Sequence, residues 1–251
     1  MTAQTDSTLS NKQAVNGRKG KNHFGLYHSP LFIWTDTAYL TTEFEAQAQL
    51  ASEIGCHLTL CYIPPFSDDL NFNDRFVRTV ERLRRLAPSL RRHEIRIGFE
   101  FIGPTETRRE TAYDFIHTID GTRALIAAAG IYGHAGLKLD VHHWRHSGAG
   151  VLDLHHCDLE YLLYVELNDG LPGHDAFTMP EFERELPLTT GVNDVAAFLR
   201  ALRRKGYRGP VAVEPWNRRI KHLPLEDAVR AVKGALDRSL DLAGERAPIP
   251  A

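Results

Sequence analysis

The sequence predicts an α/β fold whose parallel strands are arranged as in a barrel, and three observations support this prediction. Short apolar segments typical of strands alternate with helical segments along the chain, which is the pattern of right-handed βαβ units. The strand segments are almost continuously apolar, as expected of strands that are covered on both faces. Four of them carry an acidic residue at or near the carboxyl end, and in a parallel barrel these ends converge on one face.

The expected elements lie between two tails. Residues 1–22 and 241–251 are rich in polar and small side chains, so we expect disordered tails on either side of a single domain at 23–240. Six strands are fewer than the eight of a closed barrel, so the barrel is expected to be incomplete at its N-terminal side. The predicted strands are 24–33, 57–63, 95–102, 135–142, 161–168 and 210–216, and the predicted helices are 41–55, 73–93, 118–130, 193–206 and 225–239, with a short one near 151–158.

Composition and charge narrow the class of protein. The chain has 251 residues and a formal net charge of −2, whereas a nucleic-acid-binding domain is usually strongly basic. No apolar run approaches the roughly 18 residues that a membrane-spanning helix needs. The N-terminus lacks the apolar core of a signal peptide, and the three cysteines show no metal-binding spacing. We therefore expect a cytoplasmic protein that binds neither nucleic acid nor membranes.

The acidic residues at the strand ends are the candidate functional groups. One buried carboxylate could be part of a structural ion pair, but four that converge repel one another and need a cation to stay ionised. An oxygen-rich set of ligands favours Mg²⁺ or Mn²⁺, and a histidine ligand would shift the preference toward Mn²⁺, Co²⁺ or Zn²⁺. The four residues are Glu100, Asp140, Glu166 and Glu214.

Five segments resemble one known family. They are IGFEFIGP, FIHTIDG, GLKLDVHHW, YVELNDG and GYRGPVAVEPWNRR, in that order. Together they resemble the xylose-isomerase-like TIM barrels, which include sugar phosphate isomerases and epimerases, and the resemblance covers residues 24 to 240. It implies a TIM-type (β/α) barrel.

The resemblance also implies a mechanism and a set of residues. A divalent ion, Mn²⁺ first and otherwise Mg²⁺, Co²⁺ or Zn²⁺, would be held by the four strand-end carboxylates, although Glu166 stands where the family usually has histidine. Glu100 and Glu214 would move a proton on and off the substrate carbon. The substrate contacts implied or considered are His143, Arg184 and His117. By strand alternation, His142 would point away from His143.

These features predict a metal-dependent isomerase or epimerase for a small sugar or polyhydroxylated carbonyl compound. A lyase or dehydratase of the same superfamily would use related chemistry, and a non-catalytic barrel subunit is a further alternative. Two strand–helix units normal for the family are missing, which leaves sheet edges that need covering. A start codon placed too late is one explanation, and a stable partial barrel is another. We expect a homodimer or a partner subunit to cover the open edge.

Overall fold

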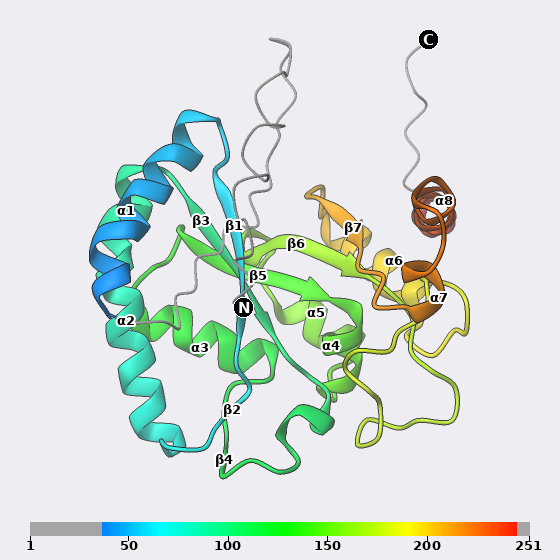
Figure 1. The fold of residues 1–251 in the computed structure, drawn as a ribbon, viewed down its shortest axis with the longest axis horizontal. Helices are drawn as coiled ribbons and strands as arrows, with labels where there is room; N and C mark the ends of the chain where they lie inside the picture. Colours follow the sequence, from blue (N-terminus) through cyan, green and yellow to red (C-terminus); the bar gives the residue numbers. More distant parts are fainter. Residues whose placement is uncertain (1–36, 245–251) are drawn as a thin grey trace, which may run out of the picture.

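The computed structural model describes residues 37–244, which form a parallel sheet with helices packed around it (Figure 1). All neighbouring strands of this sheet run parallel. A second, two-stranded antiparallel sheet lies in the loops beyond it and consists of β2 (Phe66–Ser67) and β4 (Tyr113–Asp114). The order of the main sheet is β1 (Leu58–Ile63), β3 (Arg96–Phe101), β5 (Ala135–Asp140), β6 (Leu162–Leu167) and β7 (Val211–Val213).

Helices connect and flank these strands. In Figure 1, α1, α2 and α3 lie beside the β1 and β3 part of the sheet, and α6 and α8 lie beside β6 and β7. Two short 3₁₀ turns, η1 (Thr105–Arg108) and η2 (Leu159–Tyr161), interrupt the loops. The helices are α1 (Thr37–Glu53), α2 (Phe72–Arg92), α3 (Ile119–Ala129), α4 (Val141–His146), α5 (Val151–His156), α6 (Val195–Lys205), α7 (Arg218–Lys221) and α8 (Leu225–Ala243).

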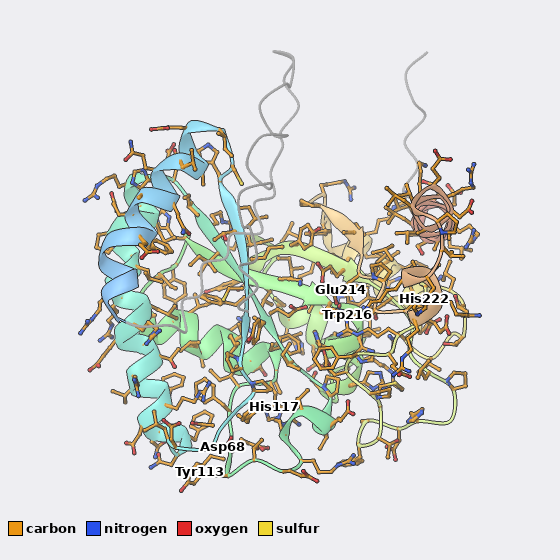
Figure 2. All side chains as sticks on the ribbon, viewed as in Figure 1. Asp68, Tyr113, His117, Glu214, Trp216 and His222 are labelled. Carbon is orange, nitrogen blue, oxygen red and sulfur yellow. The ribbon has the colours of Figure 1, made fainter. Side chains whose placement is uncertain are left out.

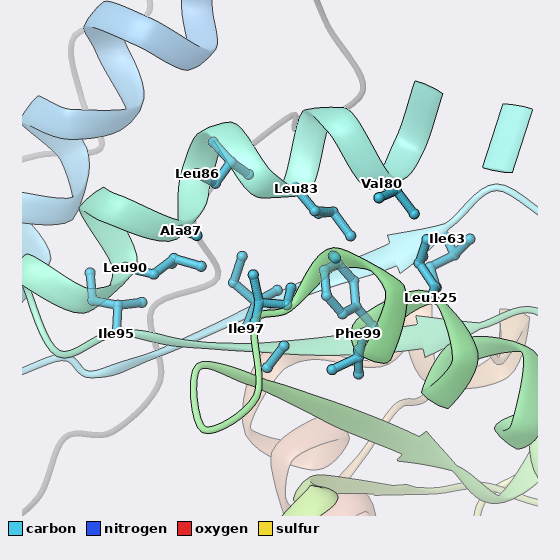
Figure 3. Close-up of a cluster of buried hydrophobic side chains, with 14 of the residues drawn as sticks. Ile63, Val80, Leu83, Leu86, Ala87, Leu90, Ile95, Ile97, Phe99 and Leu125 are labelled. Atoms are coloured by element: carbon cyan, nitrogen blue, oxygen red, sulfur yellow. The ribbon is translucent and has the colours of Figure 1, made fainter. Parts of the chain in front are cut away.

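In β3 and β5 the period of two separates an apolar face from one that carries charged side chains. Ile97 and Phe99 of β3 point toward the helices, where Leu83 and Leu90 of α2 pack over them (Figure 3). A second cluster continues this core between β5, β6 and helices α5 and α6. The alternate residues, among them Glu100, face the other side of the sheet. Burial of the apolar face therefore fixes which side chains are presented on the inner face.

The expected α/β architecture with a parallel sheet is confirmed, and the five described strands do not close into a barrel. The predicted strand at 24–33 and the predicted tail at 1–22 lie outside the described residues. The C-terminal helix continues to Ala243, past the predicted domain boundary at 240.

The predicted strand at 135–142 is corrected by the structure. The strand ends at Asp140, and the next six residues form helix α4. The Asp140 carboxylate caps this helix by accepting a hydrogen bond of 2.6 Å from the His142 backbone N–H, which is a common way to start a helix. Strand alternation therefore does not apply to His142 and His143, because both belong to the helix and both are buried.

The outer strands of the described sheet each have one neighbour, β3 for β1 and β6 for β7. That a second copy or another subunit covers this opening stays a prediction. Among the described helices, none combines the length and the apolar character that crossing a membrane requires.

We predict that Leu83→Ala destabilises the protein by about 2–5 kcal/mol, because Leu83 is fully buried between α2 and the sheet. Val77→Ala in the same helix is the control. Val77 is 57% exposed, so its truncation is expected to change stability by at most about 0.5 kcal/mol. Urea unfolding of both variants checks this, and equal effects would contradict the packing of α2 described above.

Candidate active site

The sheet brings the four predicted carboxylates together at the carboxyl ends of its strands. Glu100 lies near the end of β3, Asp140 ends β5, and Glu166 is paired with Asp140 in the register of β5 and β6. Glu214 follows β7, and its backbone N–H donates to the Leu167 carbonyl at 3.1 Å. All but Glu214 are buried. The convergence follows from strand direction and the shared inner face.

Two cations of the protein pair with these four carboxylates. The Lys138 ammonium lies 2.9 Å from Glu100 Oε2 and 2.8 Å from Glu166 Oε2. Lys138 comes from the middle of β5, two residues before Asp140, and therefore shares its inward face. Neither Lys138 nor this double ion pair was predicted from the sequence, although the period of two would have placed the lysine on the inner face.

The second cation is Arg184, which was a predicted substrate contact. Its Nη1 donates to Asp140 Oδ2 at 3.0 Å and to Glu214 Oε2 at 2.6 Å. Its Nη2 donates to Glu181 Oε1 at 2.5 Å, which adds a fifth, unpredicted carboxylate to the site. Glu181 lies in an irregular loop, where no periodicity could have indicated its direction. The arginine is thus buried among acidic side chains of three different segments.

A second buried aspartate holds the loop that carries Arg184. Asp169 follows β6, and its carboxylate accepts hydrogen bonds from four backbone N–H groups at 2.8–3.0 Å. The donors are those of Gly170, Thr190, Gly191 and Asn193. Gly170 lies at the start of the loop and the other three donors lie at its end. The Asp169 carboxylate therefore joins the two ends of the loop and restricts the movement of Arg184.

The loop is also tied to the segment after β7. The Arg184 N–H donates to the Trp216 carbonyl at 2.8 Å, and the Asn217 amide donates to the Arg184 carbonyl at 2.9 Å. Arg184 and Glu214 are therefore held in place by backbone contacts as well as by their own ion pair.

His143 projects from α4 into the same cluster. Its Nε2 lies 3.5 Å from Glu100 Oε1 and 3.6 Å from Glu181 Oε1, while Nδ1 lies 3.4 Å from the Gly103 N–H donor. Burial lowers the pKa of His143 well below its usual value, so the ring is neutral. Nε2 also lies 3.4 Å from Arg184 Nη2, so it faces two carboxylate oxygens and one guanidinium donor. His143 also lines the cavity described below, as expected of a substrate contact.

Gly103 allows α4 to approach β3 closely. A Cβ atom at this position would lie 2.1 Å from the His143 carbonyl oxygen, a distance that any larger residue would have to relieve by displacing the helix. The glycine therefore positions His143.

The carboxyl groups of the site differ in pKa. Burial raises the pKa of Glu100 to about 7, that of Glu181 to about 8 and that of Glu166 to about 9. Burial also acts to raise the pKa of Asp140, but the combined attraction of Arg184, the neighbouring histidines and Lys138 outweighs it and the pKa is lowered. Asp140 is further held by Asn168, whose amide donates to both of its oxygens at 3.1 and 2.9 Å.

Charge in the site is out of balance when every acid is ionised. Five carboxylates face the two cations Lys138 and Arg184, which leaves three negative charges. Such a site binds protons, a divalent ion, or both. Two groups of side chains offer ligand atoms that all lie within 4.8 Å of one another, and they are Glu100, Asp140 and His143, and Asp140, Glu166 and Glu214.

A cavity of about 410 Å³ opens above the cluster. Its floor is polar, while aromatic side chains form much of its wall, and the rings of Phe182 and Trp216 meet edge to face at 5.4 Å. Figure 2 shows Glu214 and Trp216 side by side near the end of β7. The lining residues used below are Glu100, Lys138, His143, Arg184 and Glu214 for the floor, and Tyr62, Phe66, Phe182 and Trp216 for the wall.

Of the predicted metal ligands, Asp140 and Glu166 do not line this cavity, and of the predicted substrate contacts, His117 does not. His117 lies before α3, apart from Glu214 and Trp216 in Figure 2, and its Nδ1 is 2.7 Å from the Phe115 carbonyl oxygen. Its contact with a substrate stays a prediction.

Comparison with known proteins gives two family matches. A family model described as xylose isomerase-like TIM barrel matches residues 27–238. A second, described as 3-dehydroquinate synthase N-terminal, matches residues 1–49. Over 40 residues, 16% of this chain, the sequence is 50% identical to the 3-dehydroquinate synthase of Thermoanaerobacter pseudethanolicus and covers 11% of that protein.

Relatives that match a longer part of the chain have a lower sequence identity. The inosose isomerase of Halalkalibacterium halodurans is 23% identical over 195 residues, or 77% of this chain, and the match spans 65% of that relative's length. A xylose isomerase domain protein from Alicyclobacillus acidocaldarius has a TM-score of 0.74 at 24% identity, covering 88% of this chain and 78% of the other.

Two further solved structures share the fold. The IolI protein with a bound zinc atom has a TM-score of 0.68 at 18% identity, covering 83% of this chain and 70% of the other. D-psicose 3-epimerase has a TM-score of 0.65 at 17% identity, covering 88% and 77%.

We predict that Glu166→Gln weakens the pH dependence of stability. The folded protein keeps the Glu166 proton up to about pH 9, whereas an unfolded glutamate loses it near its ordinary pKa. The folded state therefore binds more protons, and stability falls as pH rises toward about 9. Glutamine cannot lose this proton, so the fall between about pH 7 and about pH 9 becomes shallower.

Urea unfolding across this pH range, with a chelator present, measures the slope. Glu110→Gln, at an exposed position, is the control and is expected to keep the wild-type slope. An unchanged slope for Glu166→Gln would show that Glu166 is ionised in the folded protein.

Proposed function

The chain belongs to the xylose isomerase-like TIM barrel family, and we propose that it isomerises or epimerises a small polyhydroxylated carbonyl compound. The observation that carries this proposal is the group of buried carboxylates, held by Lys138 and Arg184, on the floor of a cavity of sugar size. Relatives whose names describe an inosose isomerase and a D-psicose 3-epimerase support the same class of reaction.

Glu100 and Glu214 are the proposed proton-transfer groups. Both line the cavity, and they come from strands on opposite sides of β5 and β6 in the sheet order, so a substrate between them would have a carboxylate on each side. With a pKa of about 7, Glu100 can hold or release a proton near neutral pH, which suits a general acid and base. One glutamate removes the proton from the carbon beside the carbonyl, and the other returns a proton to the intermediate.

We propose that a divalent ion completes the site. Asp140, Glu166 and Glu214 fit this role because their oxygens lie close together and because the site has negative charge in surplus. Glu100 is the fourth predicted ligand, and we propose His143, which lines the cavity, as a substrate contact. A bound divalent ion would supply Lewis-acid stabilisation of negative charge on a substrate oxygen. Mn²⁺ remains our first candidate, with Mg²⁺, Co²⁺ and Zn²⁺ as alternatives, and the related IolI structure holds zinc.

The cavity favours an uncharged substrate. An anionic group such as a phosphate would meet five carboxylates and only two cations, both already paired. The aromatic wall formed by Tyr62, Phe66, Phe182 and Trp216 can pack against the C–H face of a sugar or cyclitol ring. We therefore propose a neutral ketose, aldose or cyclic hydroxyketone as substrate.

We predict that the wild-type protein, supplied with metal, exchanges a carbon-bound hydrogen of its substrate with D₂O, and that Glu214→Gln slows this exchange by about 10²–10⁴-fold. Mass spectrometry of inosose, D-fructose, D-psicose and L-ribulose after incubation measures the exchange. Glu226→Gln on the exposed start of α8 is the control. Metal binding without exchange of any substrate would favour the dehydratase alternative.

We also predict that metal binding strengthens as pH rises from about 6 to about 9. Glu100 and Glu166 hold protons in this range, and a divalent ion must displace them to use the carboxylates. Calorimetric titration with Mn²⁺ in buffers of different ionisation enthalpy would detect the released protons. An affinity that does not change with pH, or no binding of any of the four metals in the order of micromolar, would contradict the metal proposal.

A further inference from the structure

Lys138 is a buried cation that lies between two of the strand-end carboxylates, Glu100 and Glu166. Its side chain is 4% exposed, and it rises from β5 on the inner face of the sheet. Gly98 on the neighbouring strand leaves room beside it, because a Cβ there would lie 3.6 Å from Lys138 Cβ and only 2.8 Å from Leu60 Cδ2. Burying an ammonium group is costly unless its hydrogen bonds are met, so its position needs a reason.

The ammonium group has one donor more than its protein partners use. The ammonium donates a hydrogen bond to Glu100 Oε2 and forms an ion pair with Glu166 Oε2, and Lys138 is also among the side chains that line the cavity. A tetrahedral ammonium bound at two positions directs its remaining N–H away from both partners. That donor is available to an oxygen atom of a molecule in the cavity.

Arg184 does not offer the same possibility. Its Nε donates to the Glu181 carbonyl at 3.0 Å, Nη1 serves Asp140 and Glu214, and Nη2 serves the Glu181 carboxylate. Nη2 also lies 3.4 Å from His143 Nε2, so all five N–H groups of Arg184 face partners within the protein, and its side chain is 1% exposed. Of the two cations in the described site, Lys138 is the better placed to contact a substrate.

We propose that Lys138 is a catalytic residue that donates a hydrogen bond from its ammonium group to the carbonyl oxygen of the substrate. The inference deepens the proposed function and rests on it. When Glu100 or Glu214 takes the proton from the adjacent carbon, the C–H electron pair forms the new carbon–carbon double bond. The carbonyl π pair moves to the oxygen, where the Lys138 N–H meets the growing negative charge. Return of a proton to carbon reverses these shifts.

The ion pair between Lys138 and Glu100 links stabilisation of the substrate oxygen to transfer of the proton from carbon. The residue that stabilises the oxygen is bonded at 2.9 Å to a residue that moves the proton. A substrate whose carbonyl oxygen reaches Lys138 therefore has its neighbouring carbon close to Glu100. The same contact favours a carbonyl oxygen, which only accepts hydrogen bonds, over the hydroxyl of a polyol, whose own proton needs a further acceptor.

The test compares Glu166→Gln with the double variant Lys138→Met/Glu166→Gln. Removing the lysine alone would leave Glu166 buried without its cation, whereas the double variant removes one positive charge and one acid together. Lys233→Met on the exposed face of α8 is the control for loss of a lysine. Thermal unfolding and Mn²⁺ titration establish that each variant is folded and binds metal.

Two measurements decide the role of Lys138. The first is calorimetric binding of inosose, a cyclic ketone, against myo-inositol, which has a hydroxyl in place of the carbonyl. We expect the wild type to prefer inosose by about 10-fold or more and the double variant to lose this preference, with Glu166→Gln as the measure of what loss of the Glu166 carboxylate alone contributes. The second is hydrogen exchange from D₂O, which we expect to be about 10²–10³-fold slower in the double variant than in Glu166→Gln.

The outcomes separate this inference from the proposed function. If the wild type binds both compounds equally, or if the double variant keeps the preference and exchanges within about threefold of Glu166→Gln, Lys138 is only a counter-ion. If no variant exchanges hydrogen but the preference for inosose depends on Lys138, the contact stands and the isomerase proposal fails.

Discussion

Pairing of buried acids with two internal cations is the constraint on which the site depends. Lys138 joins Glu100 to Glu166, and Arg184 joins Asp140 to Glu214. Without these partners the carboxylates would repel one another across the ends of adjacent strands, at a cost the apolar core would have to offset. The inner face of the sheet therefore tolerates acidic residues because each lies against a cation contributed by the fold.

The two cations are held in different ways. Lys138 belongs to a strand, so the hydrogen-bond ladder of the sheet positions it. Arg184 lies in an irregular loop, and its position depends on the Asp169 carboxylate, which gathers four backbone N–H groups at the base of that loop. The bonds to Trp216 and Asn217 add a second point of attachment. The loop can therefore present one charged group accurately despite lacking regular structure.

The excess of acid over base gives the site its chemical character. Burial raises the pKa of three glutamates toward or above neutrality, whereas Arg184 keeps Asp140 ionised. The result is a mixture of groups that readily exchange protons and one that stays charged, close to the His143 imidazole. Such a mixture suits reversible proton transfer. It also lowers the stability of the folded protein at high pH, because the buried acids ionise there.

The sequence by itself determined the parallel α/β architecture and the four strand-end acids, because strand periodicity and strand direction are local properties that fix a face and an end. It could also have indicated Lys138, two residues before Asp140. It could not indicate Glu181 or the pairing of Arg184, since loop conformation depends on distant contacts such as that of Asp169. Nor did it show that α4 begins at Val141, where the capping carboxylate of Asp140 turns the chain and brings His143 into the site. Only the tertiary structure decided which charges meet, because ion pairs depend on distances between segments far apart in the chain.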